Sequence, residues 1–383
     1  MGAPGRPARL NPKGFSRYGP KPNPKMEGTG IMPPSNLTIN GETLTFEAGQ
    51  TILEVARGAG MAVPTLCNYK DMMPTGACRV CVVEVAGARS LLPACATQAA
   101  PGMVVQTESP RVVQARKMIL ELLLASGEHD CLLCPSCGDC QLQDLAFQYQ
   151  VSPKRFDRPA DFRPTEVNPL IVRDFSRCVL CGRCVQACNE VQVNRAISFG
   201  YRGKKAKIVA AGDLPLKDSE CVFCGECVQV CPTGALTEAK ARTTWRPWKE
   251  KRRIRTTCPY CGVGCQQWLH MQDGKIVKVT GVKGAEPNRG RLCVKGRFGY
   301  DFIYSEERLK TPLIRENGTF REASWDEALD LVVSRLAAVK NEHGPDAIAG
   351  VSCARSINED SYQMQKLFRA VIGTNNIDHC ART

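Results

Sequence analysis

Two cysteine runs with the same spacing constrain this chain more than any other feature. Both follow the pattern C-x2-C-x2-C-x3-C, and together they comprise Cys178, Cys181, Cys184, Cys188, Cys221, Cys224, Cys227 and Cys231. Thiolates at this spacing hold iron–sulfur cubanes. Zinc is the alternative, but zinc sites ordinarily use one C-x2-C pair in each half of the site. The spacing therefore predicts two [4Fe-4S] clusters within residues 151–240.

The two runs closely resemble bacterial two-cluster ferredoxins, in which the fourth cysteine of each run ligates the other cluster. The resemblance implies that Cys178, Cys181 and Cys184 share one cluster with Cys231. It likewise implies that Cys221, Cys224 and Cys227 share the second cluster with Cys188. Short strands at 196–199 and 206–210 are expected between the runs, and a turn and strand at 232–236 after them.

The other cysteines are grouped as well. Of the 22 cysteines among 383 residues, twenty fall into five groups of four, and Cys353 and Cys380 stand alone. Such grouping indicates metal ligation in a reducing compartment and argues against a secreted disulfide scaffold. Because no apolar run suits a membrane span or a signal peptide, we expect a cytoplasmic protein.

The net charge of +13 is partly local. Residues 1–35 are basic and rich in Pro and Gly, so we expect a disordered tail, with Met26 or Met32 as possible true starts. Residues 241–255 form a second basic segment. A solvated linker or a subunit-docking surface is favoured there over a nucleic-acid site, and no nucleic-acid partner is predicted.

Residues 36–110 predict a [2Fe-2S] domain. Two alternating runs meet at Asn40-Gly41, a strong hairpin signal, and a helix is expected from Thr51 to about Ala59. Four cysteines follow with the spacing C-x10-C-x2-C-x13-C: Cys67, Cys78, Cys81 and Cys95. This combination is similar to β-grasp [2Fe-2S] ferredoxins, with zinc as the alternative.

Residues 111–150 begin with a helical repeat over 111–126 and continue into a cysteine-rich segment. That segment resembles the histidine-plus-three-cysteine [4Fe-4S] segment of the large complex I subunit, iron-only hydrogenases and NAD-linked formate dehydrogenases. Cys131, Cys134 and Cys140 match the family's C-x2-C-x5-C pattern. The fourth ligand stays open between His129 and Cys137, because the histidine is displaced from its usual position. Residues 141–177 are interpreted as a connecting segment.

Residues 256–310 contain Cys258, Cys261, Cys265 and Cys293, spaced C-x2-C-x3-C-x27-C, with strands expected at 267–270 and 275–280. They resemble the N-terminal [4Fe-4S] domain of molybdenum- or tungsten-bis(pterin guanine dinucleotide) oxidoreductases. The resemblance implies that Lys295 lies between cluster and pterin as an electron relay. A surface lysine is the alternative.

Residues 311–383 have an α/β pattern. A capping box at Ser324–Glu327 precedes an expected helix at 328–339, and a strand is expected at 346–351. A helix to about Ile372 and a strand from Asn375 follow.

In doubly wound sheets, ligands bind beyond the carboxyl ends of the strands, so the loop from Cys353 to Asn358 is a candidate wall of a pterin site. The other interpretation of Cys353 and Cys380 is that they are small hydrophobic residues of the core.

The order of these segments predicts an α+β multidomain protein. It consists of a β-grasp [2Fe-2S] domain, a His/Cys [4Fe-4S] segment, a two-cluster ferredoxin-like domain and the start of a molybdopterin-oxidoreductase α/β domain. The terminal segment 373–383 resembles the approach to the metal-binding residue of formate dehydrogenase catalytic subunits.

The implied function is cytoplasmic NAD(P)-linked formate oxidation, with one [2Fe-2S] cluster, four [4Fe-4S] clusters and a Mo- or W-bis(pterin guanine dinucleotide). The expected partner is a flavin- and NAD-binding diaphorase-type subunit or a hydrogenase module. An electron-wiring subunit like the large subunit of complex I, without substrate chemistry, is the alternative.

In the formate dehydrogenase family the next residue is selenocysteine or cysteine, followed by histidine. We therefore expect the codon after Thr383 to be TGA read as a stop, followed by an in-frame histidine codon. Sequencing the DNA beyond this position checks the expectation. Another stop codon, or an unrelated frame, would contradict it.

Overall fold

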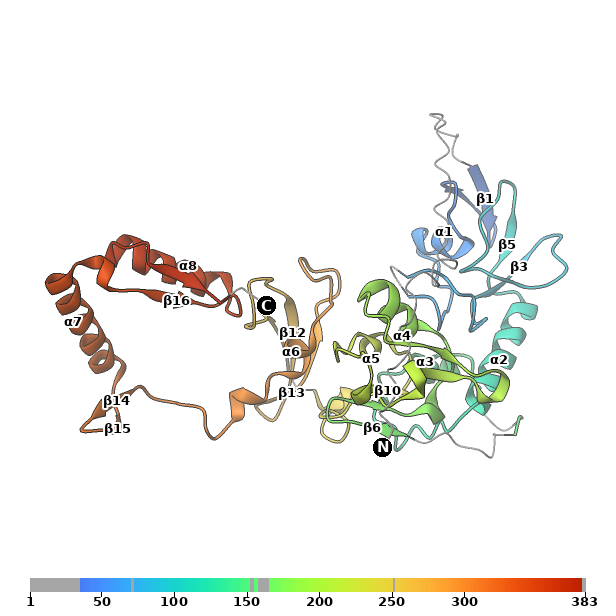
Figure 1. Ribbon diagram of the computed structural model, residues 1–383. Helices are drawn as coiled ribbons and strands as arrows, with labels where there is room; N and C mark the ends of the chain where they lie inside the picture. Colours follow the sequence, from blue (N-terminus) through green and yellow to red (C-terminus); the bar gives the residue numbers. More distant parts are fainter. Residues whose placement is uncertain (1–34, 70–71, 152–154, 158–164, 251, 381–383) are drawn as a thin grey trace, which may run out of the picture.

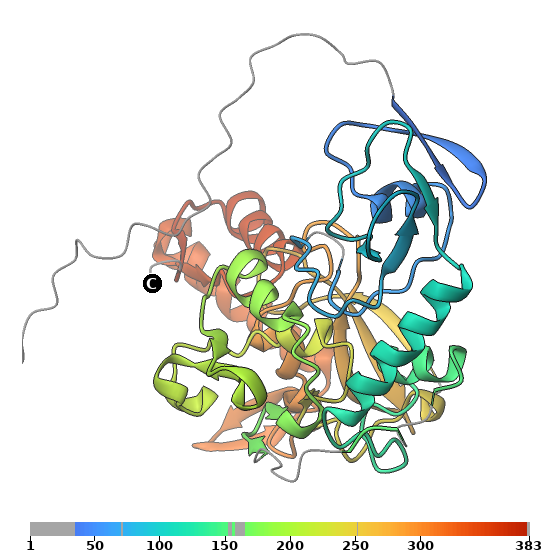
Figure 2. The same ribbon diagram turned by 90° about the vertical axis from the view of Figure 1, so that its right-hand side faces the viewer.

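The structure is a computed structural model that describes all residues except 1–34, 70–71, 152–154, 158–164, 251 and 381–383. The expected basic tail, apart from Ser35, and the candidate start residues lie outside the described part. The described modules follow one another in space roughly as in sequence (Figure 1). A view turned by 90° shows helix α2 (Pro110–Ala125) beside the sheet that contains β3 (Val82–Val85) (Figure 2).

The N-terminal hairpin is confirmed. Strands β1 (Ser35–Ile39) and β2 (Glu42–Phe46) are antiparallel, with Leu37 opposite Leu44. Asn40 and Gly41 both have positive φ, 52° and 89°, as the two central residues of a type I′ turn require. Helix α1 (Ile52–Gly58) follows as expected, and the Thr51–Glu54 capping box satisfies its first amides.

The sheet of this module has the order β2-β1-β5-β3-β4, in which β1 and β5 are parallel and the other pairs antiparallel. The remaining strands are β3 (Val82–Val85), β4 (Leu92–Pro93) and β5 (Val104–Gln106). Alternate residues of β1, such as Leu37 and Ile39, are buried against α1. The predicted β-grasp arrangement is thus present.

Helix α2 (Pro110–Ala125) matches the predicted helix and is capped by Ser109. Interpreting 141–177 as a mere connecting segment was wrong, because α3 (Gln141–Gln148) lies within it. Leu142 and Leu145 of α3 share a core with Leu120 and Leu124 of α2. Helix α3 has only 8 residues, which is too short for its apolar periodicity to be recognised in the sequence.

The two-cluster domain contains a three-stranded sheet of order β10-β7-β6, a hairpin and two short helices. Its elements are β6 (Glu166–Val167), β7 (Ile171–Arg173), α4 (Arg183–Gln186), η2 (Ala187–Val191), β8 (Ile197–Gly200), β9 (Lys207–Ala210), α5 (Glu226–Val230) and β10 (Leu236–Glu238). The expected strands between the runs are β8 and β9, which pair as a hairpin.

The two cysteine runs repeat the same backbone turn. Leu180 and Phe223, each directly before the second cysteine of its run, have φ of 52°. Gly182 and Gly225, each directly after that cysteine, have φ of 80° and 72° and begin α4 and α5. The equal spacing therefore gives equal local structure, which points the cysteines of both runs inward in the same way.

The third sheet, β11-β12-β13, is an antiparallel meander formed by β11 (Arg252–Thr257), β12 (Gln266–Gln272) and β13 (Lys275–Gly281), and α6 (Val294–Phe298) packs beside β13. The strands expected around Asp273-Gly274 are present. Three basic residues expected in the linker, Arg252, Arg253 and Arg255, belong to β11 and pair with β12. Charged and β-branched residues alternate in this strand, as they do in many strands, but its high charge favoured the interpretation as a linker.

The C-terminal unit contains a hairpin followed by an α/β unit. Its elements are β14 (Leu313–Glu316), β15 (Thr319–Glu322), α7 (Trp325–His343), β16 (Gly350–Ser352), α8 (Asn358–Lys366), η9 (Leu367–Ile372) and β17 (Ile377–His379). The expected helices are present, and β16 and β17 are parallel. The strand expected at 346–351 is shorter and begins later, because residues 345–347 form a 3₁₀ turn. The Ser324 side chain accepts from the Glu327 amide, but Glu327 itself pairs with Arg321.

Short 3₁₀ turns lie between these elements at Phe175–Arg177, Gly203–Lys205, Ala211–Asp213, Leu216–Asp218, Pro247–Lys249, Asp301–Tyr304 and Pro345–Ala347. Among the described helices, none combines the length and apolar character that a membrane span needs.

A buried arginine joins the two-cluster domain to the third sheet's module. Arg297 of α6 pairs with Glu226 of α5 at 3.1 Å, and both side chains are almost fully buried. Its other nitrogens donate to the Cys224 carbonyl at 2.8 Å and the Gln229 side chain at 2.9 Å. Three acceptors from one module thus surround one guanidinium from the next.

Replacing this arginine should destabilise the protein strongly. Arg297→Met leaves Glu226 buried without its charge partner, which ordinarily costs about 3–5 kcal/mol. Arg111→Met is the matched control, because Arg111 pairs with Glu84 at the surface, where a pair contributes about 0–1 kcal/mol. Denaturant unfolding of the cluster-loaded protein, followed by tryptophan fluorescence, measures both.

A second variant keeps this prediction testable if Arg297→Met does not fold. Arg297→Met combined with Glu226→Leu removes both charges and should recover part of the lost stability. Equal effects of Arg297→Met and Arg111→Met would contradict the assignment of Arg297 as the joining residue.

Candidate metal centres

One largely apolar cavity is lined by the eight cysteines of the two runs. Burial raises the pKa of Cys181 to about 12, and the nearby Cys231 thiolate contributes to the rise. Burial also raises the pKa of Cys221, and here the nearby thiolate is that of Cys188. The structure therefore brings the fourth cysteine of each run beside the first cysteines of the other.

Backbone amides point at several of these sulfurs. The Phe223 N–H donates to Cys221 Sγ at 3.4 Å, and the Ala196 N–H donates to Cys188 Sγ at 3.3 Å. Such bonds stabilise thiolates and adjust the reduction potential of a bound cluster. The donor set of thiolates with amide support fits the [4Fe-4S] clusters predicted here. Among the described residues, no three His, Cys, Asp or Glu side chains are arranged to hold a single metal ion.

The four cysteines of the N-terminal module are buried together. The Cys67 N–H donates to Cys78 Sγ at 3.4 Å. A hydrogen bond with Cys95 lowers the pKa of Cys81 to about 7, despite burial. Bonds with Cys78 and Cys95 lower the pKa of Cys67 as well. Four thiols from widely spaced sequence positions therefore lie close together, as a [2Fe-2S] site requires.

The cysteine-rich segment 131–140 lies against the closing turn of the two-cluster domain. A Cβ on Gly234 would stand 2.6 Å from Cys134 Sγ, so only glycine fits at this contact. The Gln141 N–H donates to the Pro232 carbonyl at 3.0 Å, directly after Cys140. Burial raises the pKa of Cys140 to about 12. The two predicted cluster sites thus meet through Cys140-Gln141 and Cys231-Pro232.

Both candidates for the fourth ligand of this segment remain near it. Burial raises the pKa of Cys131, with the Cys134 and Cys137 thiolates contributing. The Gln143 amide donates to Cys137 Sγ at 3.4 Å. The His129 Nε2 lies beside Gly127, at 3.6 Å from where a Cβ on that glycine would stand.

Three cysteines of the Cys258 group lie in the loop between β11 and β12, and the fourth, Cys293, directly precedes α6. The Cys258 N–H donates to the Cys265 carbonyl at 2.8 Å. Burial raises the pKa of Cys258, the Cys293 and Cys261 thiolates raise it further, and Lys295 opposes them. The Lys295 ammonium lies 5.9 Å from the centre of the Tyr260 ring and lines a pocket of about 200 Å³. Lys295 is thus close enough to this thiol group to act on it electrostatically.

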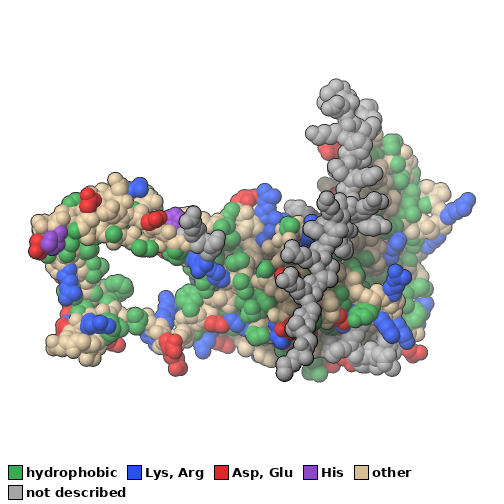
Figure 3. All heavy atoms as spheres, in the orientation of Figure 1, with side chains coloured by type: hydrophobic (Ala, Val, Ile, Leu, Met, Phe, Trp, Pro, Cys, Tyr) green, Lys and Arg blue, Asp and Glu red, His purple; other side chains and the backbone are tan. Residues whose placement is uncertain are grey.

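The loop predicted as a pterin wall reaches the same cysteine group. The Asn358 side chain donates to the Gly262 carbonyl at 2.8 Å, between Cys261 and Cys265. Behind the loop, a cavity of about 380 Å³ is lined by Ser352, Cys353, Ala354, Ser361, Gln365, Arg369, Ile377, Asp378 and His379. Figure 3 shows the C-terminal unit touching the rest on both sides of an opening.

The two solitary cysteines lie next to each other, and Cys353 lines this cavity. Cys353 Sγ and Cys380 Sγ are 3.3 Å apart. Cys380 is exposed and Cys353 is half-buried, so the interpretation of both as core residues was wrong. Their separation of 27 positions hid the contact, which depends on the pairing of β16 with β17.

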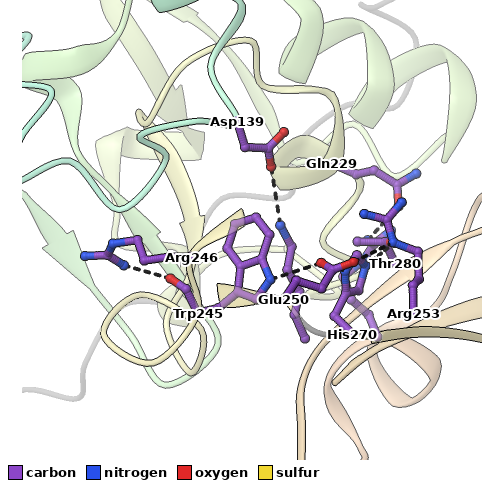
Figure 4. A network of polar contacts seen from close by, with 10 residues as sticks. Asp139, Gln229, Trp245, Arg246, Glu250, Arg253, His270 and Thr280 are labelled. Carbon is purple, nitrogen blue, oxygen red and sulfur yellow. Dashed lines mark hydrogen bonds and ion pairs between the residues drawn. The ribbon is translucent and has the colours of Figure 1, made fainter. Parts of the chain in front are cut away.

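The basic segment 241–255 is packed more tightly than a solvated linker. Trp245 is buried, and its indole donates to Glu250 at 3.3 Å. His270 and Arg253 also bind Glu250, at 2.6 and 2.8 Å (Figure 4). Burial alone would raise the pKa of Glu250, but these bonds lower it. This network was not predicted from the sequence, because its members come from separate elements.

A polar cavity of about 540 Å³ lies beside this network, where three modules meet. Lys278 spans part of it, with its ammonium 3.7 Å from Asp139 and 3.8 Å from the Trp245 ring centre. Glu238 lines the same cavity, and burial raises its pKa to about 7. The segment 241–255 therefore contributes to the joint between modules.

Comparison with known families supports the order of these sites. The chain matches, in order, a 2Fe-2S iron-sulfur cluster binding domain (33–110), the NADH-ubiquinone oxidoreductase-G iron-sulfur binding region (116–155), a 4Fe-4S dicluster domain (177–235), the molybdopterin oxidoreductase Fe4S4 domain (251–305) and molybdopterin oxidoreductase (308–383). It is 39% identical over 350 residues to an NADH-quinone oxidoreductase G-type subunit of Rhizobium meliloti (strain 1021), covering 90% of this chain and 40% of that protein.

Successive parts of the chain are therefore similar to domains of NADH-quinone oxidoreductase-G and of molybdopterin oxidoreductases. The predicted fold class is confirmed by the matched domains and their order. The chain is also 37% identical over 348 residues to the NADPH-Fe(3+) oxidoreductase subunit alpha of Geobacter sulfurreducens (strain DL-1 / KN400), covering 91% of this chain and 40% of that one. It is 32% identical over 384 residues to a "Putative formate dehydrogenase" of Staphylococcus aureus (strain USA300), covering 90% of this chain and 39% of that protein.

A solved structure of NAD+-reducing [NiFe]-hydrogenase in the H2-reduced state is also similar, with a TM-score of 0.52 and 34% identity. The match covers 55% of this chain and 90% of the hydrogenase chain. The chain spans about 40% of the length of the curated relatives that it matches. These relatives include subunits of an NADH-quinone oxidoreductase and of an NADPH-Fe(3+) oxidoreductase.

The fourth ligand of the 131–140 segment can be identified by substitution. Because one cubane takes four protein ligands, either Cys137→Ser or His129→Ala should remove the cluster or convert it, and the other should leave it intact. Iron content and low-temperature EPR of the reduced protein report the difference. Cys134→Ser is the positive control, since Cys134 belongs to both possible ligand sets. Loss with both variants, or with neither, would contradict a four-ligand site of this composition.

Proposed function

We propose that this chain is the N-terminal electron-transfer portion of a formate dehydrogenase catalytic subunit. The observation that carries the proposal is the bond from Asn358 to Gly262, which brings the loop at the carboxyl end of β16 onto the Cys258 group. A cofactor bound beyond that strand end would lie beside the first of a continuous series of cysteine groups. The relative named as a formate dehydrogenase supports the same substrate.

Five groups of residues would hold the clusters. The [2Fe-2S] cluster belongs to Cys67, Cys78, Cys81 and Cys95, and the four [4Fe-4S] clusters belong to the groups around Cys131, Cys178, Cys221 and Cys258. When bound, these clusters supply one-electron transfer, and a Mo- or W-bis(pterin guanine dinucleotide) supplies the two-electron oxidation of formate to carbon dioxide and a proton.

The protein's own contribution is position and charge. The contact of Gln141 with Pro232 holds two cysteine groups side by side, and Arg297 holds Cys224 toward the Cys258 module. Lys295 opposes the negative charge that accumulates on the Cys258 group. A cation at that place favours the arrival of electrons, which is the relay role proposed for it.

The proposed partner is a diaphorase-type subunit that binds flavin and NAD(P), or a hydrogenase module. Support comes from the names of the relatives, which include an NADH-quinone oxidoreductase component, an NADPH-dependent reductase component and an NAD+-reducing hydrogenase. A cytoplasmic location belongs to the same proposal.

An electron-wiring role without substrate chemistry is the second candidate. It is favoured by the match of residues 116–155 to the NADH-ubiquinone oxidoreductase-G region and by the NADH-quinone oxidoreductase relative. The two candidates differ in the C-terminal unit, because a wiring subunit has no use for a substrate-converting site beyond β16.

Formate-dependent reduction of an acceptor tests the proposal. The full-length protein, isolated with its partner subunits, should reduce NAD, NADP or ferredoxin when formate is added. Lys295→Met should slow this reaction about tenfold or more, because substitutions beside metal centres typically cost 10–100-fold. Acceptor reduction is followed by absorbance under anaerobic conditions.

Lys275→Met is the matched control, since Lys275 is an exposed lysine of the same module and should not affect the rate. Iron and molybdenum or tungsten contents confirm that each preparation is loaded. No formate-dependent reduction of any acceptor by a fully loaded wild type would favour the wiring role instead.

A further inference from the structure

Cys353 and Cys380 occupy equivalent positions on two neighbouring parallel strands. Ser352 of β16 is the register partner of His379 of β17, and each cysteine follows directly after its strand. Neighbouring strands lie about 4.8 Å apart. Disulfides span Cα separations of about 4.4–6.8 Å, so the backbone spacing suits a cross-link without movement of either strand.

The two side chains face each other across this spacing. Their sulfurs are 3.3 Å apart, and both are free thiols. The Arg355 N–H donates to Cys353 Sγ at 3.3 Å. Hydrogen bonds from Cys353 and from the Ala354 amide lower the pKa of Cys380. Cys380 is therefore an exposed sulfur with increased thiolate character, which is the combination that reacts with disulfides.

We propose that Cys353 and Cys380 form a reversible redox modification site that exchanges with small-molecule disulfides such as oxidised glutathione. The Cys380 thiolate attacks one sulfur of the small disulfide, forms a mixed disulfide and releases one thiolate. The Cys353 thiol then loses its proton and attacks the Cys380 sulfur, which forms the Cys353–Cys380 bond and releases the second thiolate. The small disulfide gains two electrons, and the two cysteines lose them.

The cross-link would join two walls of one cavity. Ser352, Cys353 and Ala354 line it from the end of β16, and Asp378 and His379 line it from β17. Oxidation would bind the two strand ends together, whereas the dithiol form leaves them held by backbone pairing alone. This inference concerns the chain's own thiols and does not rest on the proposed formate chemistry.

Peptide mapping tests the proposal on the full chain with its clusters loaded. The protein is incubated anaerobically with oxidised glutathione, alkylated without reduction and digested with trypsin. We expect a linked pair made of the peptide that contains Cys353, ending at Arg355, and the peptide that contains Cys380, beginning at Ala370. Treatment with dithiothreitol should separate the pair. The visible absorption of the clusters should persist throughout.

The double variant S352C/C353S is the matched control. It keeps the number of cysteines and moves one thiol by a single position along β16, which turns it to the opposite face of the strand. It should not form the linked pair, and neither should C353S or C380S alone. Absence of the pair in wild type, equal linkage in S352C/C353S, or linkage only after the cluster absorption is lost would overturn the proposal.

Discussion

The arrangement of the modules depends on how one buried positive charge is satisfied. The Arg297 guanidinium is nearly excluded from water, so its desolvation must be offset by a carboxylate and by well-placed acceptors. Glu226, Gln229 and the Cys224 carbonyl provide them, and all three come from the helix and turn that carry the second cysteine run. The Cys258 module therefore has a defined orientation to the two-cluster domain, since rotating it would leave two opposite charges buried apart.

On the other side of the two-cluster domain, a close approach of two backbone segments fixes the position of the neighbouring cysteine segment. At Gly234, the absence of a Cβ lets Cys134 come against the turn that follows Cys231. The bond from Gln141 to Pro232 holds that contact, and α3 begins there. Two cysteine groups are thereby placed beside each other by a turn rather than by a long interface. The proposed electron-transfer role needs this kind of adjacency between successive centres.

The segment between these modules shows how local composition can mislead. A run of arginines and lysines predicts a solvated linker, because isolated charges are costly to bury. Here Arg253 binds Glu250, Trp245 is buried under Lys278, and residues 252–257 complete a sheet. The charges are tolerated because their partners, Glu250 and Asp139, lie within reach after folding. Nothing in the spacing of these residues along the chain indicates that pairing.

The sequence by itself determined the local units and their chemical class. Equal cysteine spacing produced equal turns at Leu180 and Phe223, Asn40-Gly41 produced a hairpin turn, and the apolar spacing of residues 112–124 produced α2. These depend on interactions within a few residues, which a pattern records directly. Only the tertiary structure decided which distant groups meet: Arg297 with Glu226, Asn358 with Gly262, and Cys353 with Cys380. Such contacts depend on the packing of separate elements, and sequence separation carries little information about that packing.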